Sequence, residues 1–175
     1  MDLYPVKAQF LTGEEVVLRL EMDGLSCENA QLNVYHLDSL VYQQTVSEFC
    51  GDTLISIGKY DAAFAGFGVS VKACIGDRSV LLETAFDVTD NPKRSLRYGF
   101  VSDFTEEDAD NGAVEWLNKC HINMVQYYDW SYRHDQLVTD QAFYTDMMGK
   151  PICRKTVKDK IEKCTEHGMH SIAYG

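Results

Sequence analysis

The sequence predicts a two-part protein that combines an all-β domain with an α/β domain. In residues 1–92, short segments alternate apolar and polar residues with a period of two, which is the pattern of half-buried strands. In residues 93–175, compact apolar segments alternate with segments that have the three- and four-residue spacing of helices. The pattern changes at residues 90–93, a polar segment with a proline that is typical of a linker. We therefore expect domains over residues 1–92 and 93–175.

The first half is a series of strands separated by turns. Its alternating or apolar segments predict strands over residues 16–22, 32–37, 41–46, 54–57, 67–74 and 80–88. Glycines beside Thr or Asp punctuate the series at Gly13, Gly24, Gly51 and Gly76. About seven strands in about 90 residues is typical of an immunoglobulin-like β-sandwich, although the tryptophan between two paired cysteines found in antibody domains is missing.

The second half predicts strands over residues 98–104, 122–128 and 169–174. Thr105 and Asp108 resemble a capping box that would begin a helix after the first strand. That helix would bury the face listed as Ala113, Trp116, Leu117 and Cys120. A second helix is expected over residues 155–166, with Val157, Ile161 and Cys164 on its inner face and Gly168 at its end. Residues 129–152 show no regular pattern and form a long aromatic and polar stretch.

Strand–helix–strand–helix–strand is the repeat of a parallel α/β fold, in which function collects at the carboxyl ends of the strands. The expected ends are residues 103–104, 128–130 and 174–175, and two of the three carry a carboxylate beside aromatic residues.

Composition excludes several classes of function. The chain of 175 residues is 45% hydrophobic and 25% charged, which is typical of a folded globular protein rather than a disordered one. Its net charge of −11 argues against nucleic-acid binding and against an anionic membrane surface. No apolar run is long enough to span a bilayer, and the first residues do not resemble a signal peptide.

The cysteines give an indication of the cellular compartment of the protein. Six cysteines without CxxC spacing favour free, buried thiols in a reducing cytoplasm, with a Cys27–Cys74 disulfide as the alternative. We expect a cytoplasmic protein, or a secreted one if a leader has been removed.

Several strings in the second half carry a resemblance to a known family. They are RYGFVSDF at 97–104, IN at 122–123 leading to QYYDW at 126–130, YRH at 132–134, and GM at 168–169 leading to AY at 173–174. In order and spacing they resemble glycoside hydrolase family 66, the dextranases and cycloisomaltooligosaccharide glucanotransferases. YDWxYRH is the specific element. Gly175 departs from the asparagine expected after the Ala-Tyr pair.

The resemblance implies an immunoglobulin-like β-sandwich followed by a (β/α)₈ TIM barrel, here truncated to its first three strands and two helices. It also implies a retaining mechanism on α-(1→6)-linked glucan, with an Asp nucleophile and a Glu acid/base. Both catalytic residues are expected on later barrel strands, so we expect no catalytic residue in this chain and no activity from it. No cofactor and no metal site are expected.

The candidate substrate-binding residues are Tyr128, Asp129, Trp130, Tyr132, Arg133, His134 and Asp103. An aromatic ring beside a carboxylate suits a sugar, because the ring stacks on the apolar pyranose face while oxygens bind hydroxyls. The alternatives are structural. Trp130 could plug the barrel rim, Arg133 could pair with Asp129 or Asp135, and Asp103 is expected to buttress Arg133.

Two other functions remain open at this point. One is a non-catalytic carbohydrate-binding or adhesive module built on the sandwich, and the other is a different sugar-active barrel family. The expected partners are glucan or isomaltooligosaccharide, without nucleic acid or membrane. Self-association through the open edges of the partial barrel is a further expectation.

Overall fold

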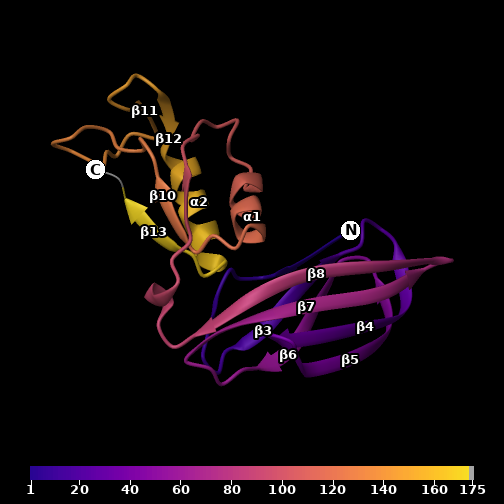
Figure 1. Ribbon diagram of the computed structural model, residues 1–175. Coiled ribbons are helices and arrows are strands. Elements are labelled where there is room, and N and C mark those ends of the chain that lie inside the picture. Colours follow the sequence, from indigo (N-terminus) through magenta and orange to yellow (C-terminus); the bar gives the residue numbers. More distant parts are fainter. Residues whose placement is uncertain (174–175) are drawn as a thin grey trace. The chain divides into compact units, whose positions relative to one another are not determined.

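The computed structural model describes residues 1–173, so the predicted strand end at Tyr174 and Gly175 lies outside the described residues. The chain divides into two compact units, Met1–Ser95 and Leu96–Gly175. Within residues 1–173, every helix is too short or too polar to cross a bilayer. The fold is mostly β-sheet with two α-helices (Figure 1).

The first unit contains two sheets. The smaller has the antiparallel order β1-β3-β6, formed by β1 (Asp2–Pro5), β3 (Glu15–Glu21) and β6 (Thr53–Lys59). The larger has the order β2-β8-β7-β4-β5, formed by β2 (Phe10–Leu11), β8 (Arg78–Thr89), β7 (Phe64–Ile75), β4 (Ser26–His36) and β5 (Ser39–Cys50). Its pairs are antiparallel except the short β2–β8 pair.

One hydrophobic core joins the two sheets of this unit. Leu18 of β3 is fully buried, as is Leu32 of β4, and both belong to the same cluster. Phe67 and Phe86 stack in the core with ring centroids 5.1 Å apart. The period-two pattern identified this core correctly, because alternate residues of a strand face one side of its sheet. The six predicted strands are confirmed, while β1 and β2 were not predicted.

The cysteines are all free thiols, so the Cys27–Cys74 disulfide is not formed. Only Cys27, Cys153 and Cys164 are buried, and the expectation of burial is wrong for Cys50, Cys74 and Cys120.

The second unit is a parallel sheet with the order β13-β10-β9. Its strands are β9 (Tyr98–Val101), β10 (Met124–Tyr127) and β13 (His170–Ala173), connected through α1 (Gly112–Lys119) and α2 (Arg154–Glu166). The two helices lie side by side next to the sheet (Figure 1). A 3-10 helix, η1 (Pro92–Arg94), occupies the predicted linker, with Asn91 as its N-cap.

The first helix differs from its prediction. Thr105 and Asp108 do form the expected hydrogen bonds, from the Thr105 N–H (2.8 Å) and hydroxyl (2.6 Å) to Asp108 Oδ2, but these close a turn and α1 begins only at Gly112. The buried residues of α1 are Val114 and Asn118, whereas Trp116 is 67% exposed. The predicted apolar face is right for Leu117, which packs against the core, and wrong for Ala113, Trp116 and Cys120, which are exposed.

The stretch over residues 129–152 contains a hairpin that the sequence did not predict. β11 (Phe143–Thr145) pairs antiparallel with β12 (Pro151–Cys153). The Cys153 N–H donates to the Phe104 carbonyl at 2.7 Å, which attaches the hairpin to the end of β9. The hairpin thus lies beside the carboxyl ends of the parallel strands.

The second helix ends as predicted. After the C-cap His167, Gly168 adopts a φ of +69°. Its N–H donates to the Thr165 carbonyl at 2.9 Å, and the Met169 N–H donates to the Cys164 carbonyl at 2.9 Å. These are the two bonds of a Schellman motif, which favours glycine because a Cβ destabilises a positive φ.

Gly168→Ala is expected to lower the free energy of unfolding of the second unit by about 1 kcal/mol, because alanine tolerates a positive φ poorly. Gly168→Asn is the matched control and should cost less, since asparagine also ends helices in this conformation. Chemical denaturation of the three proteins measures the difference. Equal stabilities would contradict this account of the helix end.

A charged cluster joins the two helices. Glu115 of α1 lies 3.2 Å from Lys163 Nζ of α2 and 3.2 Å from His167 Nε2. Burial by itself would raise the pKa of Glu115, but the Lys163 and His167 contacts outweigh it and the pKa is lowered. A carboxylate with a lowered pKa in the folded state stabilises the fold above its ordinary pKa, and that stability is lost as the pH falls through the lowered value.

Glu115→Gln should therefore destabilise the second unit at neutral pH by about 0.5–1 kcal/mol, a value reduced for partial exposure. The difference should begin to shrink below pH of about 4.3 and vanish at lower pH, where the wild-type carboxylate is protonated as well. Urea denaturation across this range is the measurement, with the exposed Glu162→Gln as control. A difference that is independent of pH would show that the cluster acts through packing rather than charge.

Candidate functional site

The parallel register places the ends of the three strands at one edge of the sheet. Tyr127 pairs with Val101 on one side and with Ala173 on the other. The Tyr128 N–H continues the ladder by donating to the Val101 carbonyl at 2.8 Å. Residues 102–104 and 128–130 therefore follow their strands at the same edge, which is where open α/β sheets bind ligands.

A pocket of about 290 Å³ lies at this edge. One wall comes from the segment after β10 and contains Tyr128, Asp129, Ser131 and His134. The rest of the lining comes from the tip of the β11–β12 hairpin, with Asp146, Met147 and Met148. The structure thus brings three of the sequence-predicted residues, Tyr128, Asp129 and His134, to one pocket.

Trp130 lies elsewhere. Asp129 lies in a turn and has a φ of +52°, in the left-handed region of backbone conformation. Trp130 packs against the hydrophobic core and lines a smaller pocket of about 160 Å³ beside α2, together with Tyr144 and Ile161. Asp129 and Trp130 thus line two different pockets, and the aromatic ring that accompanies Asp129 is Tyr128, whose ring lies 6.3 Å from that of Phe100.

Tyr132 and Arg133 form a stacked pair. The Arg133 guanidinium lies over the Tyr132 ring at 4.7 Å, and Tyr132 in turn meets Tyr144 edge-on at 5.8 Å. Within the described chain, Arg133 forms an ion pair with neither Asp129 nor Asp135. Backbone bonds from Tyr132 to Leu137 (3.0 Å) and from Arg133 to Gln136 (3.1 Å) close the loop that exposes His134.

Asp103 does not buttress Arg133, so that expectation is wrong. Lys150, just before β12, donates to Asp103 Oδ1 at 2.9 Å and also to the Ser102 carbonyl. The hairpin brings this lysine to the end of β9, and the ammonium neutralises the carboxylate there. Asp103 lines a different pocket from Asp129, one of about 270 Å³ beside β9.

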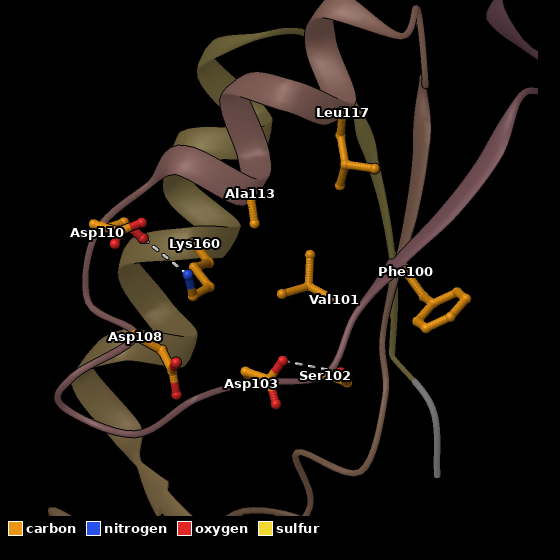
Figure 2. Close-up of a pocket in the computed structure, with 9 residues that line it drawn as sticks. All are labelled: Phe100, Val101, Ser102, Asp103, Asp108, Asp110, Ala113, Leu117 and Lys160. Atoms are coloured by element: carbon orange, nitrogen blue, oxygen red, sulfur yellow. Dashed lines mark hydrogen bonds between the residues drawn. The ribbon is translucent and has the colours of Figure 1, made fainter.

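Figure 2 shows the pocket beside β9. Val101 points toward the helices, while Phe100 points to the other side of the strand. Lys160 of α2 is only 3% exposed and donates to the Asp110 carbonyl at 2.9 Å. The Thr105 hydroxyl and N–H lower the pKa of Asp108, which keeps that carboxyl ionised. Lys160 and Asp108, two charged residues of this pocket, therefore already have hydrogen-bond partners within the protein.

The residues that sequence reasoning missed share a source, which is the unpredicted hairpin. Asp146, Met147, Met148 and Lys150 all belong to the turn between β11 and β12. A signal was present, because Asp146 and Gly149 have the i and i+3 spacing of a β-turn. Within residues 1–173, no group of three or more His, Cys, Asp or Glu side chains is placed to hold a metal ion.

This chain is similar to proteins named cycloisomaltooligosaccharide glucanotransferases. A crystal structure of a cycloisomaltooligosaccharide glucanotransferase from Paenibacillus sp., complexed with cycloisomaltoheptaose, superposes with a TM-score of 0.84 at 24% identity. The match covers 100% of this chain and 27% of that one. Two cycloisomaltooligosaccharide glucanotransferases of Niallia circulans are 26% and 24% identical over 96% and 98% of this chain.

The family itself is shown by the sequence model of glycosyl hydrolase family 66, which matches residues 5–175. The chain belongs to this family, as the strings at 97–104 and 126–134 indicated. It spans 19% of the length of the curated relatives that it matches.

Proposed function

We propose that this chain is the N-terminal part of a glycosidase or glucanotransferase that acts on α-(1→6)-linked glucan. Membership of glycosyl hydrolase family 66 supports the glucan substrate, as do the names of the relatives. The observation that carries the proposal is the pocket where Tyr128 and Asp129 follow a central parallel strand.

The architecture of the whole protein is also part of the proposal. Two sheets around one core support an immunoglobulin-like sandwich for residues 1–95. The order β9-α1-β10-α2-β13, with all three strands parallel, supports the first part of a (β/α)₈ barrel for the second unit. In such a barrel the pocket of Asp129 would belong to the catalytic face, where the active sites of these folds lie.

The chemistry of the pocket suits a sugar. The Tyr128 side chain is 43% exposed and offers an aromatic face to the apolar side of a pyranose ring. The Asp129 carboxylate accepts hydrogen bonds from hydroxyl groups, and the exposed His134 ring adds a further polar contact. We assign recognition of glucan to these three residues, and structural support to Trp130 and Tyr132.

The catalytic pair is proposed to lie outside these 175 residues. A retaining glycosidase needs two carboxyl groups about 5–5.5 Å apart across one scissile bond. The two carboxylates that follow β9 and β10, Asp103 and Asp129, line different pockets, and Lys150 neutralises Asp103. This arrangement supports binding rather than bond cleavage by the chain on its own.

Glucan binding is tested by titrating isomaltotriose into the 175-residue chain. Asp129→Asn should weaken binding about tenfold or more, because a hydrogen bond to a charged group contributes ~1.5–3 kcal/mol and 1.4 kcal/mol is tenfold in affinity. Asp135→Asn is the control, since this exposed carboxylate does not line the pocket. No binding by the wild-type chain, or equal binding by both variants, would reject this pocket as the glucan site.

The division between binding and catalysis is tested separately. The 175-residue chain should release no reducing sugar from dextran, whereas a protein of the full length of the family relatives with the same N-terminal part should release it or form cyclic products. Product analysis by chromatography measures both. Turnover by the short chain would overturn the placement of the catalytic pair elsewhere.

A further inference from the structure

We infer that Asp146, at the tip of the β11–β12 hairpin, is a ligand-binding residue whose buried Oδ2 oxygen accepts a hydrogen bond from a hydroxyl group of a neutral sugar ring. The inference deepens the proposed function and rests on it, because Asp146 lines the same pocket as Tyr128 and Asp129. It would make the hairpin, rather than the strand ends alone, responsible for recognising the sugar.

One oxygen of Asp146 is used by the turn that it begins. Oδ1 accepts from the Met148 N–H at 2.9 Å and from the Lys150 N–H at 2.7 Å. The backbone adds bonds from the Asp146 N–H to the Lys150 carbonyl (2.9 Å) and from the Gly149 N–H to the Asp146 carbonyl (3.2 Å). An asparagine would accept the same two N–H bonds through its own carbonyl oxygen. The turn therefore does not require a carboxylate at this position.

The second oxygen is buried and has no hydrogen-bond partner within the described chain. Asp146 is only 7% exposed, and its Oδ2 atom is shielded from solvent. Burial of a carboxylate oxygen without a hydrogen bond destabilises a fold, so such atoms generally have a partner or serve a function. The partner that Oδ2 lacks must be a hydrogen-bond donor, because an ionised carboxylate only accepts.

The surroundings of Asp146 define the class of that donor. The pocket has a carboxylate on each wall, Asp129 on one and Asp146 on the other, which disfavours an anionic ligand. Metal ions are disfavoured because residues 1–173 contain no suitable group of three ligating side chains. The Tyr128 ring and the methionine side chains offer apolar contact. A pocket that combines two carboxylate acceptors with aromatic and methionine side chains matches a pyranose ring that carries hydroxyl groups.

Because Oδ2 is shielded from solvent, a ligand reaches it only if the pocket lining rearranges, and Met147 and Met148 are part of that lining. Met147 is 41% exposed and Met148 is 83% exposed, so both side chains have room to change rotamer. Methionine is well suited to such a role, since it is unbranched and adapts its shape to the surface beside it. A sugar that displaces Met148 would reach the carboxylate directly or through one ordered water, which serves nearly as well as a direct bond.

The test titrates isomaltotriose into the wild-type chain and into Asp146→Asn, with Asp129→Asn in parallel. Asp146→Asn should weaken binding about tenfold, while the Met148 and Lys150 amides keep their protection from hydrogen exchange because Oδ1 is retained. A second readout needs no variant: the carboxyl ¹³C resonance of Asp146 in the wild-type chain should shift as isomaltotriose is added. This resonance still tests the inference if the Asp146→Asn variant loses the turn.

The outcomes separate this inference from the proposed function. No binding of isomaltotriose by the wild-type chain overturns both. Weakened binding by Asp129→Asn, with unchanged binding by Asp146→Asn and a constant Asp146 resonance, leaves the glucan site in place and rejects Asp146 as a ligand. Weakened binding by both variants with a shifting resonance is the result expected here.

Discussion

The parallel pairing of β10 with a strand on each side is the constraint on which the second unit depends. Val125 and Tyr127 of this central strand are buried, and desolvation raises the pKa of the Tyr127 hydroxyl well above its usual range. The same register fixes where β9, β10 and β13 end. Because side chains alternate along a strand, a slip of one residue would exchange the core and the opposite face of the sheet. It would also move Tyr128 and Asp129 away from their pocket.

The hairpin turns a sheet edge into a pocket. Strand ends alone present side chains in a shallow row, whereas the β11–β12 hairpin adds a facing wall attached through the Cys153–Phe104 hydrogen bond and the Lys150–Asp103 ion pair. The first of these contacts is backbone and largely independent of side-chain identity. The second depends on charge and gives Asp103 a partner in the hairpin, whereas Asp129 lines the pocket.

The sequence predicted the structural features that depend on residues close together in the chain, and it missed those that depend on residues far apart in the sequence. Local periodicity located the core strands, and Gly168 marked the end of α2, because both depend on residues close together in the chain. Thr105 and Asp108 made the predicted bonds but closed a turn, since a capping box fixes a few dihedral angles and not the helix that follows. Lys150 and Asp103 are far apart in sequence, and no local pattern signals that they meet.

The backbone at Asp129 decides how the most specific string of the sequence is used. A positive φ is uncommon outside glycine, but aspartate tolerates it better than most residues because its short polar side chain bonds locally. The turn that it makes sends Tyr128 to the pocket and Trp130 to the core, so two adjacent aromatic residues serve different purposes. A string of the YDWxYRH type thus combines recognition and support. Trp130 and Tyr132 pack around Tyr144, whose hydroxyl donates to the Trp130 carbonyl, and this contact braces the hairpin against the segment that carries Asp129.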